Sequence, residues 1–126
     1  MTLGIGWHKD KWLDIDNIQI SANDRGLKFG DGIFETILIK NNNAILIDEH
    51  IQRLENSSKV LSIDFNINKS YLKEIISLGI QKLSLKNDQL GSIRINYTRG
   101  LNKGRSIRMN NSLQDNYINN LWIEFY

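Results

Sequence analysis

Apolar side chains occupy every second position in two segments near the end of the chain. This alternation extends over residues 92–98 and again over residues 119–126, and it has the period of a strand with one buried face. Both segments are therefore predicted to be strands. In the first of them the apolar face consists of Ile93, Ile95 and Tyr97, and the polar face consists of Arg94 and Asn96.

Further strands are predicted in the first 47 residues. Residues 33–40 are rich in β-branched and aromatic residues. The run Asn41-Asn42-Asn43 turns this strand back into residues 44–47, because Asn tolerates a positive φ. Residues 4–20 alternate more weakly, with Asp10-Lys11 as a turn between two short strands. Two glycine-containing turns, at residues 23–26 and 29–32, precede the strand at 33–40.

Two segments between these strands have the helical period. Asp48 can cap a helix that runs to about Ser62, and its inner face would consist of Ile51, Leu54 and Leu61. A second helix is predicted to begin near Asn68 or Ser70, with an apolar stripe of Leu72, Ile75, Ile76, Ile80 and Leu83. This order of elements predicts an α+β fold, in which an antiparallel or mixed sheet has two helices packed on one face.

Length and composition predict one domain over residues 1–126. A chain of 126 residues with 40% hydrophobic and 24% charged residues can bury a core and is too short for two domains. The net charge of +2 is small for a nucleic-acid-binding protein of this size. The chain has no cysteine, which excludes disulfides, thiolate metal sites and cysteine nucleophiles. We expect no metal site.

Neither a membrane span nor a secretion signal is visible. No run approaches the roughly 18 apolar residues of a span, and the first residues lack a basic start and an apolar stretch. We therefore expect a cytoplasmic protein that binds neither membrane nor nucleic acid. Residues 121–126 are mostly apolar to the last position, which predicts that the polypeptide continues. A terminal strand held in a sheet has the same pattern.

Three patches contain residues suited to chemistry, and the first spans residues 24–36. Three glycines in seven positions lead from charged residues into a strand, which predicts a loop folded tightly against another part of the protein. Structural glycines with positive φ explain the same spacing. The Gly-x-x-x-x-Gly-Lys-Ser/Thr pattern of a phosphate loop is absent.

The second patch, residues 50–54, places His50 and Arg53 one helical turn apart on one helix face. An arginine there can bind a phosphate or carboxylate through a forked pair of charged hydrogen bonds, or it can form an ordinary surface ion pair. In the third patch, residues 94–108, a strand leads into a basic loop that either closes over an anionic substrate or is a solvated turn. This loop would carry Arg99, Lys103, Arg105 and Arg108.

Together these patches resemble the class IV pyridoxal-phosphate enzymes, which include branched-chain and D-amino-acid aminotransferases and 4-amino-4-deoxychorismate lyase. The resemblance covers residues 20–105, and its motifs arrive in the order of the family. They are Asp24-Arg25-Gly26, Phe29-Gly30-Asp31-Gly32-Ile33-Phe34-Glu35-Thr36, His50-x-x-Arg53-Leu54 and Thr98-Arg99-Gly100. Each motif alone is weak, but four in this order and spacing are specific. The resemblance implies the small N-terminal domain of such an enzyme.

The resemblance implies roles for three residues. Arg53 would bind the phosphate of pyridoxal 5'-phosphate, since a phosphate ester requires a fixed cation. Phe34 stands where the family often has a tyrosine beside the substrate, so the hydrogen bond of that hydroxyl would be missing. Arg105 matches a loop arginine that holds a substrate carboxylate and often reaches the partner subunit. The sequence Phe34-Glu35-Thr36 is closer to the lyase branch than to branched-chain aminotransferases, which have Phe-Glu-Gly.

The chain departs from the family in one respect. Family members are longer and have two domains, and the lysine that forms the Schiff base with the cofactor lies in the second. No lysine of this chain occupies a matching position. Because that lysine holds the cofactor and transfers protons, we expect this chain alone to be inactive and assign no catalytic residue in it.

Three explanations follow. The chain is a fragment of a complete enzyme, which we favour, or the inactive product of a truncated gene, or a binding or oligomerisation module that keeps part of the cofactor-phosphate and substrate surface. For the complete enzyme the resemblance implies a homodimer that acts on a small molecule. The reaction would be amino transfer from an amino acid to a 2-oxo acid, or removal of pyruvate from aminodeoxychorismate to give 4-aminobenzoate for folate biosynthesis.

Overall fold

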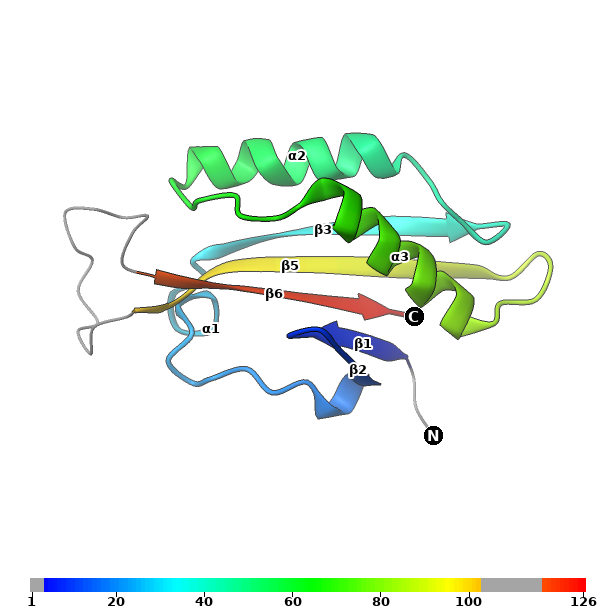
Figure 1. Ribbon diagram of the computed structural model, residues 1–126, viewed down its shortest axis with the longest axis horizontal. Helices are drawn as coiled ribbons and strands as arrows, with labels where there is room; N and C mark the ends of the chain where they lie inside the picture. Colours follow the sequence, from blue (N-terminus) through cyan, green and yellow to red (C-terminus); the bar gives the residue numbers. More distant parts are fainter. Residues whose placement is uncertain (1–3, 103–116) are drawn as a thin grey trace.

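A six-stranded antiparallel sheet is the frame of the computed structural model, which describes residues 4–102 and 117–126 (Figure 1). The strands lie in the order β2-β1-β6-β5-β3-β4, and each neighbouring pair is antiparallel. The α+β prediction is confirmed. The strands are β1 (Ile5–His8), β2 (Lys11–Asp14), β3 (Gly32–Lys40), β4 (Asn43–Ala44), β5 (Leu90–Asn102) and β6 (Tyr117–Phe125). The helices are α1 (Arg25–Phe29), α2 (Ile47–Val60) and α3 (Lys69–Leu83), with a 3-10 helix at Ile15–Asn17.

Helices α2 and α3 cover one face of the sheet and build the core with it (Figure 1). The alternation along β3 turns Ile37 and Ile39 toward these helices, whereas Phe34 and Leu38 are exposed on the opposite face. We call the face away from α2 and α3 the open face. Each isoleucine buried in the core contributes roughly 1.5–3 kcal/mol. The neighbouring strands add Ile93, Ile95, Ile123 and Phe125 to the same core.

Helix α2 begins without the side-chain cap that the sequence predicted. Its N-cap is Leu46, which has a left-handed backbone (φ 56°) and forms no side-chain capping bond. Asp48 lies in the first turn instead, where its charge interacts favourably with the helix dipole. Ile51 and Leu54 are buried as predicted. Leu61 follows the last helical residue and is 38% exposed, so the prediction of an inner-face position for it is wrong.

Helix α3 begins and packs as predicted. Asn68 is its N-cap, and the side-chain oxygen accepts a hydrogen bond from the backbone N–H of Tyr71 at 3.0 Å. Gly79 lies against the ring of Phe125, where a Cβ would collide with that ring. The glycine therefore allows the helix to approach the sheet closely. The buried residues of the predicted stripe are Leu72, Ile75, Ile76 and Ile80.

The segment before β3 contains a short helix where the sequence predicted a turn. Asp24 is the N-cap of α1, and its carboxylate accepts a hydrogen bond from the N–H of Gly26 at 2.8 Å. Gly30 ends the helix with a left-handed backbone (φ 65°). Gly26 lies against Thr98 of β5, where a Cβ would collide with the threonine side chain. This contact places α1 on the open face, at one end of the sheet.

Candidate functional site

A buried carboxylate links strand β3 to helix α2. Glu35 shares the inward face of β3 with Ile37 and is only 5% exposed. A charged group in this position requires polar partners, and α2 provides two of them. His50 Nδ1 lies 2.7 Å from Glu35 Oε2, and Arg53 donates its Nε–H to Glu35 Oε1 at 3.0 Å. The predicted common face of His50 and Arg53 is thus the face that meets Glu35.

Arg53 combines this fixed contact with an exposed end. Its side chain is 72% exposed, and its Nη atoms have no hydrogen-bond partner among the described residues. Its partner Glu35 lies in a part of β3 that β4 does not cover, since β4 pairs with β3 only at Ile39 and Lys40. A guanidinium with two free Nη groups can form a forked, charge-assisted contact with an anion such as a phosphate.

Phe34 follows on the open face, at the neighbouring position of the same strand. It is 56% exposed, and the guanidinium carbon of Arg94 lies 3.9 Å from the centre of its ring. This distance is that of a cation–π contact. Arg94 also donates its Nε–H to the side-chain oxygen of Asn96 at 2.9 Å. Its Nη atoms, like those of Arg53, have no partner in the described part of the chain.

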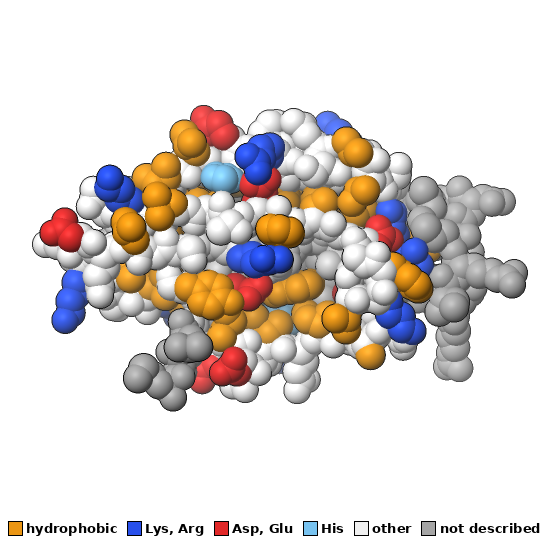
Figure 2. All heavy atoms as spheres, turned by 180° about the vertical axis from the view of Figure 1, so that it is seen from behind, with side chains coloured by type: hydrophobic (Ala, Val, Ile, Leu, Met, Phe, Trp, Pro, Cys, Tyr) orange, Lys and Arg blue, Asp and Glu red, His pale blue; other side chains and the backbone are white. Residues whose placement is uncertain are grey.

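A cleft of about 400 Å³ opens beside Phe34 and Arg94. Hydrophobic side chains gather over this side of the molecule, with basic and acidic groups between them (Figure 2). An apolar cleft with a few fixed polar groups has the character of a small-molecule site. The residues that line it are Ile20, Gly26, Leu27, Gly30, Gly32, Ile33, Phe34, Arg94, Asn96, Thr98 and Trp122.

The polar side chains behind Arg94 form a hydrogen-bonded row. Asn96 donates a side-chain N–H to Glu124 Oε2 at 2.7 Å, and the hydroxyl of Tyr126 donates to Glu124 Oε1 at the same distance. Burial and this bond to Glu124 raise the pKa of Tyr126 to about 12. Tyr126 therefore keeps its proton at neutral pH and holds Glu124 in place.

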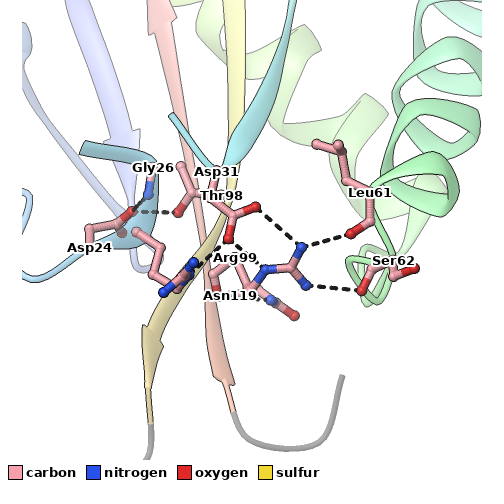
Figure 3. Close-up of polar contacts among 9 residues, drawn as sticks. Asp24, Gly26, Asp31, Leu61, Ser62, Thr98, Arg99 and Asn119 are labelled. Carbon is pink, nitrogen blue, oxygen red and sulfur yellow. Dashed lines mark hydrogen bonds and ion pairs between the residues drawn. The ribbon is translucent and has the colours of Figure 1, made fainter. Parts of the chain in front are cut away.

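Arg99 lies outside the predicted loop and holds parts of the fold together through hydrogen bonds (Figure 3). It lies within β5 and is 3% exposed. Its Nε and Nη2 donate to the two oxygens of Asp31 at 2.6 and 3.2 Å, while the carbonyls of Leu61 and Ser62 accept from Nη2 and Nη1 at 2.7 and 3.0 Å. The prediction that Arg99 belongs to a basic loop is wrong, because Arg99 lies in β5 and its donors join the end of α2 to the loop before β3.

Asp31 lies between two guanidinium groups. Arg25 donates to the Asp31 carboxylate at 2.9 Å in addition to the contacts from Arg99. Burial acts to raise the pKa of Asp31, but hydrogen bonds from Arg99 and Arg25 outweigh it and hold that pKa below its usual value. Asp31 is thus an ionised partner of the fold and is not available as a proton donor at neutral pH.

Asp24 fixes α1 to the sheet. It is 1% exposed and accepts hydrogen bonds from the Thr98 hydroxyl at 2.8 Å and from the Asn120 side-chain amide at 3.0 Å, besides the N–H of Gly26. Two of the sequence motifs, Asp24-Arg25-Gly26 and Thr98-Arg99-Gly100, therefore meet in one structural cluster (Figure 3).

Arg105, the predicted substrate-binding residue, lies outside the described residues, as do Lys103 and Arg108. Within the described ranges, no group of three or more acidic or histidine side chains is placed to hold a metal ion. No helix in those ranges is long and apolar enough to cross a membrane.

Two residues of this site were missed by the sequence analysis. Glu35 could have been found because it is an acidic residue on the apolar face of an alternating strand, and such a position demands a cationic partner. Arg94 was placed on the polar face of its strand and at the start of the third patch, without a role of its own. Its proximity to Phe34 depends on the pairing of β3 with β5, in which Thr36 lies opposite Arg94.

The chain matches the family model described as amino-transferase class IV over residues 32–119. It is 34% identical over 83 residues to the D-alanine aminotransferase of Staphylococcus aureus strain N315, which covers 66% of this chain and 28% of that protein. It is 31% identical over 98 residues to the D-alanine aminotransferase of Listeria innocua, covering 77% of this chain and 32% of that protein. The chain thus spans about a third of the length of the curated relatives it matches.

Solved structures share the fold. A hypothetical aminotransferase from Mycobacterium tuberculosis in a PLP-bound form superimposes with a TM-score of 0.78 at 19% identity, covering 98% of this chain and 39% of that one. The 4-amino-4-deoxychorismate lyase of Pseudomonas aeruginosa gives a TM-score of 0.66 at 22% identity, covering 94% of this chain and 38% of that one.

Proposed function

The chain belongs to the class IV aminotransferase family, and from this we propose that it provides the phosphate-binding and substrate-facing part of a pyridoxal 5'-phosphate enzyme. The observation that carries the proposal is Arg53, whose guanidinium is held at Nε by buried Glu35 while both Nη groups are free among the described residues. Such an arginine fits a phosphate ester, which needs a fixed cation with two adjacent donors.

Residues on the open face fit the substrate side of the proposed site. When bound, the cofactor supplies an electron sink for reactions at the α-carbon of an amino acid. Phe34 provides an apolar wall at the mouth of the cleft, which excludes water from one side. Arg94 provides a second fixed guanidinium, stacked on that wall, and its free Nη groups suit a carboxylate of the substrate.

In this proposal the described part of the chain supplies binding groups, and the aldehyde carbon of the cofactor is held elsewhere. None of the lysines in the described residues lines the cleft at Phe34. We assign the anchoring lysine and proton transfer at the α-carbon to residues outside these 126 positions, so that this chain alone is inactive. A cytoplasmic homodimer with Arg105 at the substrate is part of the same proposal.

For the reaction we favour amino transfer between an amino acid and a 2-oxo acid. The curated relatives with 31–34% identity are named D-alanine aminotransferase, and an amino acid with an ionised carboxylate suits the cation at Arg94. Elimination of pyruvate from aminodeoxychorismate, giving 4-aminobenzoate, is the second candidate. It is favoured by the Phe34-Glu35-Thr36 sequence.

A binding module without catalysis is the alternative. Both proposals require that Arg53 binds a phosphate, and one titration tests this binding. Pyridoxamine 5'-phosphate and pyridoxamine differ only in the phosphate, and neither has an aldehyde that could react with lysines. We expect the chain to bind the phosphorylated compound more tightly, and Arg53→Ala to reduce that preference at least about tenfold, the cost of a lost charged contact. An unchanged preference in Arg53→Ala would contradict the proposal.

A further inference from the structure

An exposed arginine normally samples many rotamers, yet Arg53 is held at one atom. Its side chain is 72% exposed, whereas the carboxylate that it contacts is 5% exposed. The carboxylate belongs to Glu35 in the middle of β3, opposite Ile95 of β5. Because Glu35 is enclosed between sheet and helix, core packing fixes its position. Its hydrogen bond to Nε then restrains the side chain of Arg53.

The atom that Glu35 contacts determines which donors remain free. Arginine has five N–H donors, one on Nε and four on the two Nη atoms. Glu35 accepts from Nε at 3.0 Å and so leaves free the edge formed by the two Nη atoms, where one N–H of each Nη points away from the Nε–H. A carboxylate bound at the Nη edge would instead occupy the donors that a phosphate requires.

His50 fixes the other oxygen of the same carboxylate. Its Nδ1 lies 2.7 Å from Glu35 Oε2, while Arg53 occupies Oε1. With its proton on Nδ1, the His50 ring donates a hydrogen bond to this carboxylate oxygen. Both partners come from α2, one helical turn apart, and together they hold the Glu35 side chain in a single orientation.

We propose that Glu35 is the positioning residue of the phosphate site and that His50 secures it. The inference rests on the proposed function, because it assigns the free Nη edge of Arg53 to the cofactor phosphate. Glu35 itself does not touch the phosphate. It acts by removing, before binding, the rotamer freedom that Arg53 would otherwise lose on binding.

Two effects of Glu35 on phosphate affinity have opposite signs. As a negative charge near the site, the carboxylate repels a phosphate, and its removal alone would strengthen binding. As a positioning group, it lowers the entropy that binding costs, and its removal would weaken binding. We expect positioning to be the larger effect, because the Nη edge points away from Glu35 and the guanidinium lies between the two anions.

The test compares three variants in the titration of pyridoxamine 5'-phosphate against pyridoxamine. Glu35→Leu removes the acceptor and should weaken binding of the phosphorylated compound about threefold to tenfold, the factor for immobilising one long side chain, with pyridoxamine unaffected. Glu35→Gln keeps an oxygen for the Nε–H and should stay within about twofold. Glu55→Gln removes the same charge from an α2 residue that pairs with Lys69 at 2.8 Å and should change nothing.

The outcomes separate this inference from the proposed function. Equal or tighter binding in Glu35→Leu overturns the positioning role, even where Arg53→Ala lowers the phosphate preference. A phosphate preference that survives in Arg53→Ala overturns both.

The rigidity of Arg53 can also be measured on the unmodified chain, so this test does not depend on whether a variant folds. Nitrogen relaxation at Arg53 Nε should show a group as rigid as the α2 backbone before any ligand is added. An order parameter below about 0.6, the range of flexible groups, would overturn the inference.

Discussion

At the scale of single residues, the arginines of this protein differ in which of their donors the fold already uses. Arg99 donates hydrogen bonds from Nε and both Nη groups to Asp31 and to two carbonyls at the end of α2. Arg53 and Arg94 each use Nε for a neighbour and leave their Nη groups without a partner in the described residues. The first pattern stabilises the fold, and the second suits an anionic ligand.

Because of the Asp31–Arg99 contact, the free energy of unfolding should decrease as the pH falls into the acid range. The pKa of Asp31 is lowered in the folded chain, so its contribution is present above its ordinary value of 3.8 and is lost as pH falls through the lower folded value. We expect Asp31→Asn to lower the free energy of unfolding by about 3 kcal/mol at neutral pH, because it leaves the Arg99 charge without its buried partner.

Urea denaturation from pH 7 down to pH 2 measures both effects. The variant should lose less stability than the unmodified chain over the acid part of this range. Parallel stability curves would show that Asp31 does not titrate with folding.

The buried hydrogen bond between Thr98 and Asp24 provides a second test. Thr98→Val preserves the shape of the side chain and removes the hydroxyl that donates to the Asp24 carboxylate at 2.8 Å. Because the acceptor is charged and buried, we expect a loss of about 2 kcal/mol in the free energy of unfolding. A change below about 0.5 kcal/mol in urea denaturation, the level of an ordinary surface substitution, would contradict the assigned role.

At the scale of elements, the two long helices begin in different ways, and this difference is measurable. Asn68 caps α3 through its side chain, whereas Asp48 lies inside the first turn of α2. We expect Asn68→Ala to lower the free energy of unfolding by about 1 kcal/mol. Asp48→Ala should cost only a few tenths, because it loses a dipole interaction and an exposed ion pair with Lys73.

Thermal or urea unfolding of both variants tests this difference, and Asn68→Ala should lose clearly more stability than Asp48→Ala. Equal losses would mean that Asp48 acts as a cap after all, as its position in the sequence suggested.

The elements that sequence analysis located correctly are those with a regular period. The alternation at residues 92–98 and the helical stripe from Leu72 to Ile80 repeat over several turns, so packing on one face selects them. Helix α1 and the left-handed N-cap at Leu46 have no such repeat, because local contacts with β5 and the turn after β4 determine them. These were missed.

In the site, as in the fold, only neighbours with a local sequence pattern could be predicted. His50 and Arg53 share a helix, so their spacing alone placed them on one face. Glu35 reaches them only through the packing of α2 on β3, and Arg94 reaches Phe34 only through strand pairing. Such long-range neighbours follow from the fold and have no local signal.

At the scale of the whole molecule, the open face carries apolar side chains that the described residues do not cover. Leu27 is 65% and Leu38 is 44% exposed there. Exposed apolar patches mark interaction surfaces, and we expect the chain to associate with itself in sedimentation equilibrium. Leu27→Asp with Leu38→Asp should lower the association constant by about tenfold or more, since each buries an unpaired charge.

Val60→Asp is the matched control, because Val60 is 83% exposed at the end of α2, away from the open face. Association that persists in the double variant, or that Val60→Asp weakens equally, would place the interface elsewhere.

In the proposed phosphate site, Arg53 is held through Nε by Glu35 and binds the phosphate of the cofactor. This site can be seen in a crystal structure of the chain grown with pyridoxamine 5'-phosphate. We expect a phosphate group within hydrogen-bond distance of both Arg53 Nη atoms, with the Nε–Glu35 contact retained. A phosphate bound elsewhere would show that Arg53 is not its ligand, and an Arg53 side chain that has left Glu35 to reach the phosphate would show that Glu35 does not position it.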